Sequence, residues 1–186
     1  YLQTSISDIY AIGDCAELSH PDASRKSIEA VWYTGRMMGK TIAQTICDKP
    51  TKYNPGIWFN SAKFFDIEYQ VYGDIPTNIP ENITSLYWKH PSENKSIRIN
   101  FEKSSGAVTG FNLLGIRYRQ VVCEKWIRDK THIETVIENL LLANFDPEFF
   151  DQYEGAFLEM YNQKSGKSLT LKSKRKLSMV TKFLFG

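Results

Sequence analysis

Hydrophobic residues follow different periods along this chain. Residues 9–12 form a short apolar run of the β type that ends in Gly13 and Asp14. The run predicts a buried strand whose carboxyl end presents a carboxylate to a ligand. From Ser27 onward, apolar or small residues recur at steps of three and four, at Ile28, Val31, Gly35, Met38, Ile42 and Ile46. That spacing predicts an amphipathic helix, with Ser24 or Ser27 as its candidate N-cap.

A series of short strands is expected next. The segments 64–72, 84–90, 96–103 and 107–114 are rich in β-branched, aromatic and other apolar residues, and turn-rich segments separate them. Within 96–103 apolar and polar residues alternate, which predicts a strand with one face in water, as antiparallel sheets commonly have. The polar positions of this strand are Arg98, Asn100 and Glu102.

Helical spacing returns after the last strand. A first stripe contains Tyr118, Val121, Val122 and Trp126. A second helix is expected to begin at Thr131 or Thr135, and a third to cover residues 149–161. Helices that follow strands without regular alternation indicate an α+β fold, here an antiparallel β-meander with helices on one face.

The amino-acid composition excludes few classes of function for this chain. The 186 residues are 42% hydrophobic and 24% charged, as in ordinary soluble proteins. A formal net charge of +2 gives no general argument for nucleic-acid binding. We find no apolar run near the roughly 20 residues that span a bilayer and no signal-peptide pattern. A cytoplasmic location is therefore the expectation.

The three cysteines do not form a metal or disulfide motif. Cys15, Cys47 and Cys123 are widely spaced and no pair forms C-x-x-C, so reduced thiols and no metal site are expected. A redox role for Cys15 is the alternative, because thiol pKa values fall near helix starts.

Gly13 and Asp14 are the residues most suited to ligand chemistry. An ionised carboxylate accepts hydrogen bonds and can hold two vicinal hydroxyls, while glycine lets a ligand approach the backbone. The competing interpretation makes Asp14 a turn or helix-capping residue. Gly35 and Gly39 resemble part of a phosphate loop, but glycines inside a helical pattern more often permit close packing, which is our interpretation.

The segment Tyr10-Ala11-Ile12-Gly13-Asp14-Cys15-Ala16 resembles the second flavin-binding motif of the FAD-dependent pyridine nucleotide-disulfide oxidoreductase superfamily. The following helix and Trp58-Phe59-Asn60-Ser61 are similar to its ferredoxin, rubredoxin and nitrite reductase branch, in which such a stretch introduces an interface domain. The resemblance is specific over residues 4–73 and architectural beyond them.

This resemblance implies specific contacts with FAD. Asp14 would accept hydrogen bonds from the ribityl hydroxyls, and Gly13, Cys15 and Ala16 would adjoin the cofactor. The helix after them would direct its positive amino end toward the pyrimidine side of the flavin. Trp58 would either lie against the isoalloxazine or anchor the linker to the next domain.

Departures from the family are equally informative. No G-x-G-x-x-G occurs in the sequence, and neither the paired catalytic cysteines nor the His-Pro-Thr pattern of the disulfide reductases is found. We therefore expect residues 1–50 to be the carboxyl-terminal piece of an FAD-binding domain. Residues 51–163 would form an interface and dimerisation domain, and residues 164–186 a basic tail.

The function expected from these observations is part of an FAD-dependent NAD(P)H:acceptor oxidoreductase. The amino-terminal FAD and NAD(P)H domains would be supplied by missing sequence, and the chain alone would not retain FAD or catalyse. A non-catalytic module for self-association or partner docking is the alternative. Lys63 is a further, weaker candidate for meeting a negative flavin or acceptor.

The tail has an unbalanced charge. Seven basic and no acidic residues follow residue 163, while Leu177, Val180, Phe183 and Leu184 could line one helical face. A solvated tail is one interpretation. The other is a basic amphipathic segment that contacts an anionic membrane surface or an acidic electron carrier such as ferredoxin.

Overall fold

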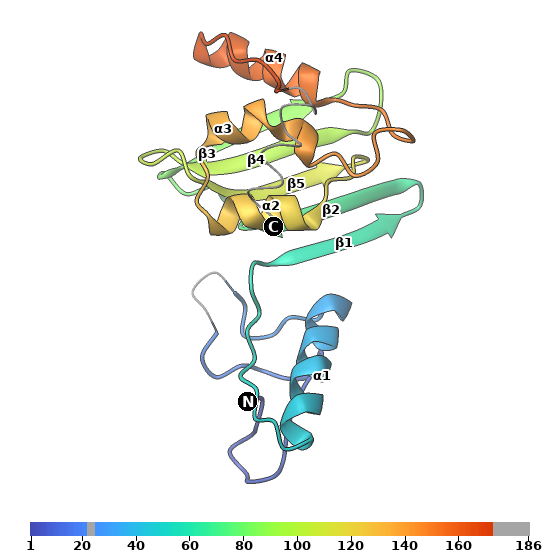
Figure 1. The fold of residues 1–186 in the computed structure, drawn as a ribbon, viewed down its shortest axis with the longest axis vertical. Coiled ribbons are helices and arrows are strands. Elements are labelled where there is room, and N and C mark those ends of the chain that lie inside the picture. Colours follow the sequence, from blue (N-terminus) through green and yellow to red (C-terminus); the bar gives the residue numbers. More distant parts are fainter. Residues whose placement is uncertain (22–24, 173–186) are drawn as a thin grey trace. The chain divides into compact units, whose positions relative to one another are not determined.

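The chain divides into two compact units. The computed structural model describes residues 1–21 and 25–172 (Figure 1). An amino-terminal unit comprises Tyr1–Asn60 and a carboxyl-terminal unit begins at Ser61. The boundary predicted from the sequence lies after residue 50. The assignment of the two parts as an FAD-binding piece and an interface domain stays a prediction. Ser24 and the tail beyond Lys172 lie outside the described residues.

The amino-terminal unit consists of one long helix and the loops around it. Helix α1 covers Trp32–Ile46. The prediction of a strand at residues 9–12 is wrong, because Tyr10 forms only an isolated antiparallel bridge with Gln3. Ile9 is 52% exposed. A short apolar run becomes a buried strand only when neighbouring strands pair with it, and in the described part of this unit only Gln3 does so.

Helix α1 begins later than expected and without the predicted cap. Its N-cap is Val31, and no side chain caps the first turn. Ser27 instead donates its hydroxyl to Glu17 at 3.2 Å, so its assignment as the cap is wrong. At Gly35 the helix packs on the loop, since a Cβ there would lie 3.7 Å from the Cα of Gly13, whereas at Gly39 nothing lies within 4 Å of that position and the packing interpretation is wrong.

The carboxyl-terminal unit contains a five-stranded sheet in the order β1-β2-β5-β4-β3. Its strands are β1 Phe59–Phe64, β2 Ile67–Gly73, β3 Ile83–Lys89, β4 Ser96–Glu102 and β5 Val108–Leu114. The pairs β2–β5, β3–β4 and β4–β5 are antiparallel, which confirms the expected type of sheet. The expected strand 64–72 is interrupted by a turn at Phe65 and Asp66, where Phe65 has a φ of 50°.

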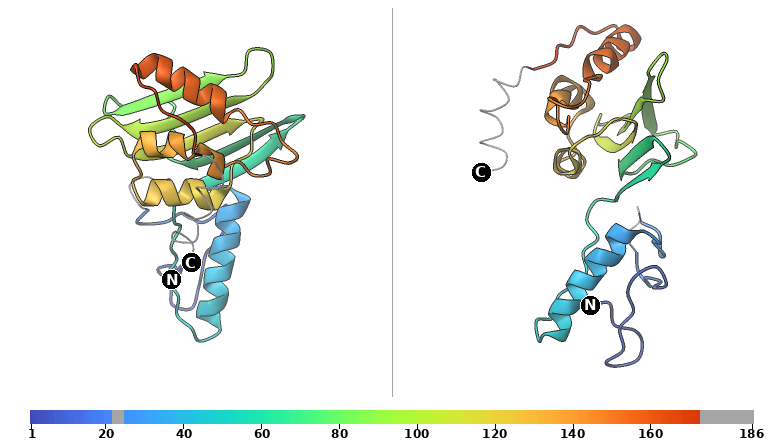
Figure 2. Two further views of the ribbon diagram at one scale, coloured as in Figure 1. Left: turned by 45° about the horizontal axis from the view of Figure 1, so that its top comes forward. Right: turned by 90° about the vertical axis from the view of Figure 1, so that its right-hand side faces the viewer.

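The helices of this unit lie on the same side of the sheet (Figure 2), as the sequence predicts. They are α2 Gln120–Arg128, α3 Ile133–Glu138, the short 3-10 helix η1 Leu140–Leu142, and α4 Glu154–Ser165. Helix α3 begins at Ile133, between the two expected starts at Thr131 and Thr135, and its N-cap is His132, which accepts the backbone N–H of Glu134. Helix α4 starts later than expected, since a turn closed by Asp146 precedes it.

The core lies between this sheet and its helices. Ile97 and Ile99 of β4 and Phe111 of β5 have no exposed surface, and Trp126 of α2 packs on Phe111 with 6.0 Å between ring centroids. The prediction of a wet second face on β4 is wrong at Asn100, which is 1% exposed. Asn100 pairs with Gly110, and the Asp74 backbone passes so close to Gly110 that a Cβ would lie 2.4 Å from its carbonyl oxygen.

A buried carboxyl group stands at the start of α4. Glu154 is completely buried, and its Oε1 accepts a hydrogen bond from Asn144 Nδ2 at 3.1 Å. Burial raises the pKa of Glu154 because it disfavours the charged carboxylate, while the hydrogen bond from Asn144 opposes the rise. The folded protein is therefore more stable when the Glu154 carboxyl group is protonated.

Replacement of Glu154 by Gln tests this point. A raised folded pKa contributes stability that is fully present below the unfolded pKa and is lost as pH rises through the folded pKa. We expect Glu154→Gln to increase the free energy of unfolding near pH 7, with the gain vanishing below about pH 4. Urea unfolding of both proteins across this range measures it, and a variant that is less stable at pH 7 would contradict the assignment.

Candidate functional site

The loop after Tyr10 is fixed by its backbone and presents its polar side chains outward. Gly13 adopts a φ of 82°, and its N–H donates to Met38 Sδ at 3.3 Å. The Ala16 N–H donates to the Gly13 carbonyl at 3.1 Å, which closes a tight turn, and Ala16 is buried. Asp14 and Cys15, between them, are exposed. The turn thus leaves a carboxylate accessible on an anchored backbone.

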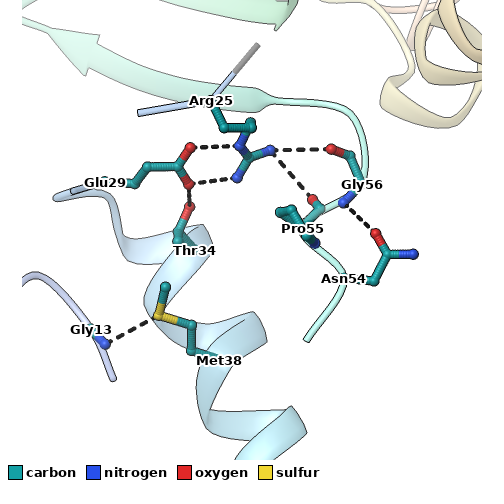
Figure 3. A network of polar contacts seen from close by, with 8 residues as sticks. All are labelled: Gly13, Arg25, Glu29, Thr34, Met38, Asn54, Pro55 and Gly56. Carbon is teal, nitrogen blue, oxygen red and sulfur yellow. Dashed lines mark hydrogen bonds and ion pairs between the residues drawn. The ribbon is translucent and has the colours of Figure 1, made fainter. Parts of the chain in front are cut away.

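A buried ion pair lies beside α1. Arg25 Nε and Nη2 donate to the two carboxylate oxygens of Glu29, each at 2.5 Å, and the two side chains are only 3% and 4% exposed. Thr34 donates its hydroxyl to Glu29 Oε2 at 3.1 Å. Such a bidentate pair fixes the plane of the guanidinium as well as its position (Figure 3).

Helix α1 supports both the loop and the ion pair. Thr34, which holds Glu29, and Met38, which holds Gly13, are four residues apart and therefore lie on one face of the helix. Each is 2% exposed. Figure 3 shows both attachments on this helix. Because one rigid helix carries them, the positions of Gly13 and Glu29 are coupled.

The same arginine reaches the linker that leads out of this unit. Arg25 Nη1 donates to the carbonyl oxygens of Pro55 and Gly56, at 3.4 and 3.2 Å. Asn54 Oδ1 accepts the Gly56 N–H at 3.0 Å, and Gly56 has a φ of 60°. The guanidinium also stands 5.1 Å from the ring centroid of half-buried Trp58. The linker is therefore held through its backbone and through an aromatic side chain.

Burial also alters a tyrosine in this linker. It raises the pKa of Tyr53, and the positive charge of Arg25 opposes the rise. The Tyr53 hydroxyl stays protonated at neutral pH.

An open pocket of about 680 Å³ adjoins the loop. Among the predicted ligand residues, Ala16 lines this pocket, whereas Gly13, Asp14, Cys15 and Trp58 do not. Helix α1 and the Arg25–Glu29 pair connect Gly13 with Trp58. Lys63 belongs to the carboxyl-terminal unit, where it is exposed beside another pocket of about 300 Å³.

The cysteines offer no paired redox chemistry in the described structure. Cys15 and Cys47 are exposed free thiols, and Cys123 is buried. Cys15 lies in the turn and not at a helix start, so the reason for expecting a reactive thiol there does not hold. In residues 1–21 and 25–172, no group of three His, Cys, Asp or Glu side chains could hold a metal ion.

The described start of the basic tail contacts α3. Lys167 forms an ion pair with Glu134 and lowers the pKa of that carboxyl group, and Lys172 pairs with Glu138 at 2.9 Å. These two lysines are thereby partnered within the chain. The cluster around Lys174 and the apolar face from Leu177 lie outside the described residues.

Sequence reasoning missed Arg25 and Glu29. Opposite charges four residues apart usually indicate an exposed pair on a helix, yet here the segment between them is irregular and the pair is buried. The available signal was the spacing itself, directly before the amphipathic helix. Its burial depends on the linker thirty residues later and could not be read locally.

Solved structures share the fold of this chain, although no protein-family model matches its sequence. A NAD-dependent persulfide reductase from A. fulgidus is 20% identical, with a TM-score of 0.62 over 89% of this chain and 33% of its own. A pyridine nucleotide-disulfide family oxidoreductase from Enterococcus faecalis is 16% identical, with a TM-score of 0.54 over 89% and 42%. Reduced CoADR-RHD of Bacillus anthracis is 20% identical, with a TM-score of 0.55 over 84% and 31%.

The chain therefore shares its fold with part of each of these three structures, one of which is a pyridine nucleotide-disulfide family oxidoreductase, in agreement with the resemblance. It spans between 31% and 42% of the length of these three structures. In the described residues no helix is both long and apolar enough to cross a membrane.

The ion pair yields a stability prediction. Glu29→Ala leaves the Arg25 guanidinium buried without its carboxylate, which should cost about 3–5 kcal/mol of unfolding free energy. Arg25→Leu/Glu29→Leu should recover most of that loss, because it removes both charges. Hydrogen exchange of the α1 amides measures local unfolding in the amino-terminal unit.

Lys26→Met is the matched control, since Lys26 is exposed beside Arg25 and its loss should change exchange little. A double variant as unstable as Glu29→Ala would show that the pair does not act through charge compensation.

Proposed function

We propose that this chain forms one wall of the flavin site and the interface domain of an FAD-dependent NAD(P)H:acceptor oxidoreductase. Missing amino-terminal domains would supply the remaining FAD and NAD(P)H contacts. The observation that carries the proposal is the anchored turn at Gly13, with the exposed carboxylate of Asp14 beside it. The fold shared with solved oxidoreductases supports it.

The proposed roles follow from the chemistry of each group. The Asp14 carboxylate would accept hydrogen bonds from two ribityl hydroxyls, and Gly13 would let the cofactor approach the backbone. Helix α1 has no side-chain cap, so the positive end of its dipole would face the cofactor unopposed by a capping side chain. Trp58 would shield the ring system from water. Bound FAD would supply the hydride and electron chemistry.

Removing the Asp14 carboxylate should weaken FAD binding. A hydrogen bond to a charged group contributes about 1.5–3 kcal/mol, so Asp14→Ala should raise the Kd for FAD by about tenfold or more in the protein that includes the missing domains. Asp14→Asn, which keeps one acceptor oxygen, should lose less. Titration of apoprotein with FAD, followed by flavin fluorescence, measures both.

Glu81→Ala serves as the control, because Glu81 is an exposed carboxylate of the carboxyl-terminal unit. Equal affinity of the wild type and Asp14→Ala would refute the assigned role of Asp14.

The broader proposal has a direct test. The chain would be produced together with an upstream segment that carries two G-x-G-x-x-G units. We expect a yellow protein whose flavin is reduced by NADH or NADPH. A colourless protein, or the absence of such an upstream sequence, would count against the flavoenzyme.

Self-association is a second candidate function, supported by exposed aromatic side chains. Phe65 at the β1–β2 turn is 98% exposed and Phe149 before α4 is 80% exposed. Contiguous exposed apolar side chains mark interaction surfaces. We propose that the carboxyl-terminal unit uses these residues in a homo-oligomer, and that exposed basic groups could also meet an acidic electron carrier.

Substitution of these aromatics should weaken association. Truncating an aromatic anchor of an interface costs about 2 kcal/mol or more, so Phe65→Ser alone should raise the self-association Kd by about thirtyfold and Phe65→Ser/Phe149→Ser by more. Analytical ultracentrifugation measures this. Ile46→Ser, which changes an exposed residue of the amino-terminal unit, is the control, and a monomeric wild type would exclude the proposal.

A further inference from the structure

Arg25 is a buried arginine whose guanidinium contacts a carboxylate, two backbone carbonyls and an aromatic ring. Its side chain is 3% exposed, its Nε and Nη2 are bound by Glu29, and its Nη1 by two linker carbonyls. Burying an ion pair costs desolvation energy and is weak evidence for stability alone. What this pair supplies is geometry, because a bidentate carboxylate permits few orientations of the guanidinium.

That fixed guanidinium determines where Trp58 lies. The Trp58 ring is stacked on Arg25, with 5.1 Å from Cζ to the ring centroid. The carbonyls of Pro55 and Gly56, just before it in sequence, are bound by the same group. Arg25 therefore contacts both the backbone that leads to Trp58 and the side chain of Trp58.

We propose that Arg25 is the positioning residue that holds Trp58 against the flavin, with Glu29 orienting Arg25 and Thr34 linking both to α1. This inference rests on the proposed function. Met38 on the same helix face holds Gly13. Helix α1 would therefore fix the positions of Asp14 and Trp58 relative to each other around the cofactor. The charge of Arg25 is compensated by Glu29, so its role is geometric.

The geometric role predicts that lysine cannot replace Arg25. Lysine keeps the charge but lacks the planar fork that binds a carboxylate and two carbonyls together. In the FAD-loaded protein, Arg25→Lys should therefore resemble Arg25→Leu/Glu29→Leu, which removes both charges and retains folding. Each should still take up FAD, because Asp14 is unchanged, so that the fluorescence of the bound flavin can be compared between the variants.

Fluorescence of the bound flavin supplies the test, because an aromatic ring stacked near a flavin quenches its emission. We expect Trp58→Leu to raise this fluorescence severalfold, and Arg25→Lys and the double variant to raise it similarly. Adding Trp58→Leu to the double variant should cause no further rise, since the ring would already be displaced. Lys26→Met should match the wild type.

Wild-type fluorescence in both Arg25 variants, or an additive effect of Trp58→Leu, would overturn the positioning role while leaving FAD binding intact. A wild-type protein that takes up no FAD would overturn this inference together with the proposed function. Loss of FAD binding in Asp14→Ala alone would support the function and leave the Arg25 comparison decisive.

Discussion

The amino-terminal unit depends on one buried ion pair. Arg25 and Glu29 are nearly inaccessible to water, and each connects segments that lie apart in the sequence. Glu29 is bound to α1 through Thr34, while Arg25 holds the linker at Pro55 and Gly56. Because this unit has a single helix and little sheet, such polar attachments replace the packing that usually orders loops.

Helix α1 connects the ion pair to the Gly13 turn, where we propose that the cofactor binds. Thr34 and Met38 share a face of α1, so the linker and the Gly13 turn are attached to one rigid element. A site assembled from separate loops needs this kind of common support, since small displacements weaken ligand contacts. Asp14 and Trp58 could thus act on one ligand without touching each other.

Much of the carboxyl-terminal fold could be predicted from the sequence. Alternation within β4 and the helical spacing after Arg117 are local signals, and both elements form. The strand at Ile9 failed because its burial requires partners outside the run. The sequence predicts an exposed Asn100, because the approach of the Asp74 backbone to Gly110 arises only from tertiary structure.

The residues of the candidate site also fall into those that the sequence indicates and those that only the fold shows. Gly13 and Asp14 were found because their chemistry and order along the chain are local. Arg25 and Glu29 were missed since their function depends on carbonyls at Pro55 and Gly56, which come together only on folding. The fold shared with the three solved structures covers between 31% and 42% of those chains, so the flavin site stays a proposal.

The most direct measurement is a crystal structure, with FAD bound, of this chain together with the proposed amino-terminal FAD and NAD(P)H domains. The account predicts that the Asp14 carboxylate lies within hydrogen-bonding distance of the ribityl hydroxyls, about 2.5–3.0 Å, with the Trp58 ring near the isoalloxazine. FAD bound elsewhere, with the Asp14 carboxylate in solvent, would contradict it.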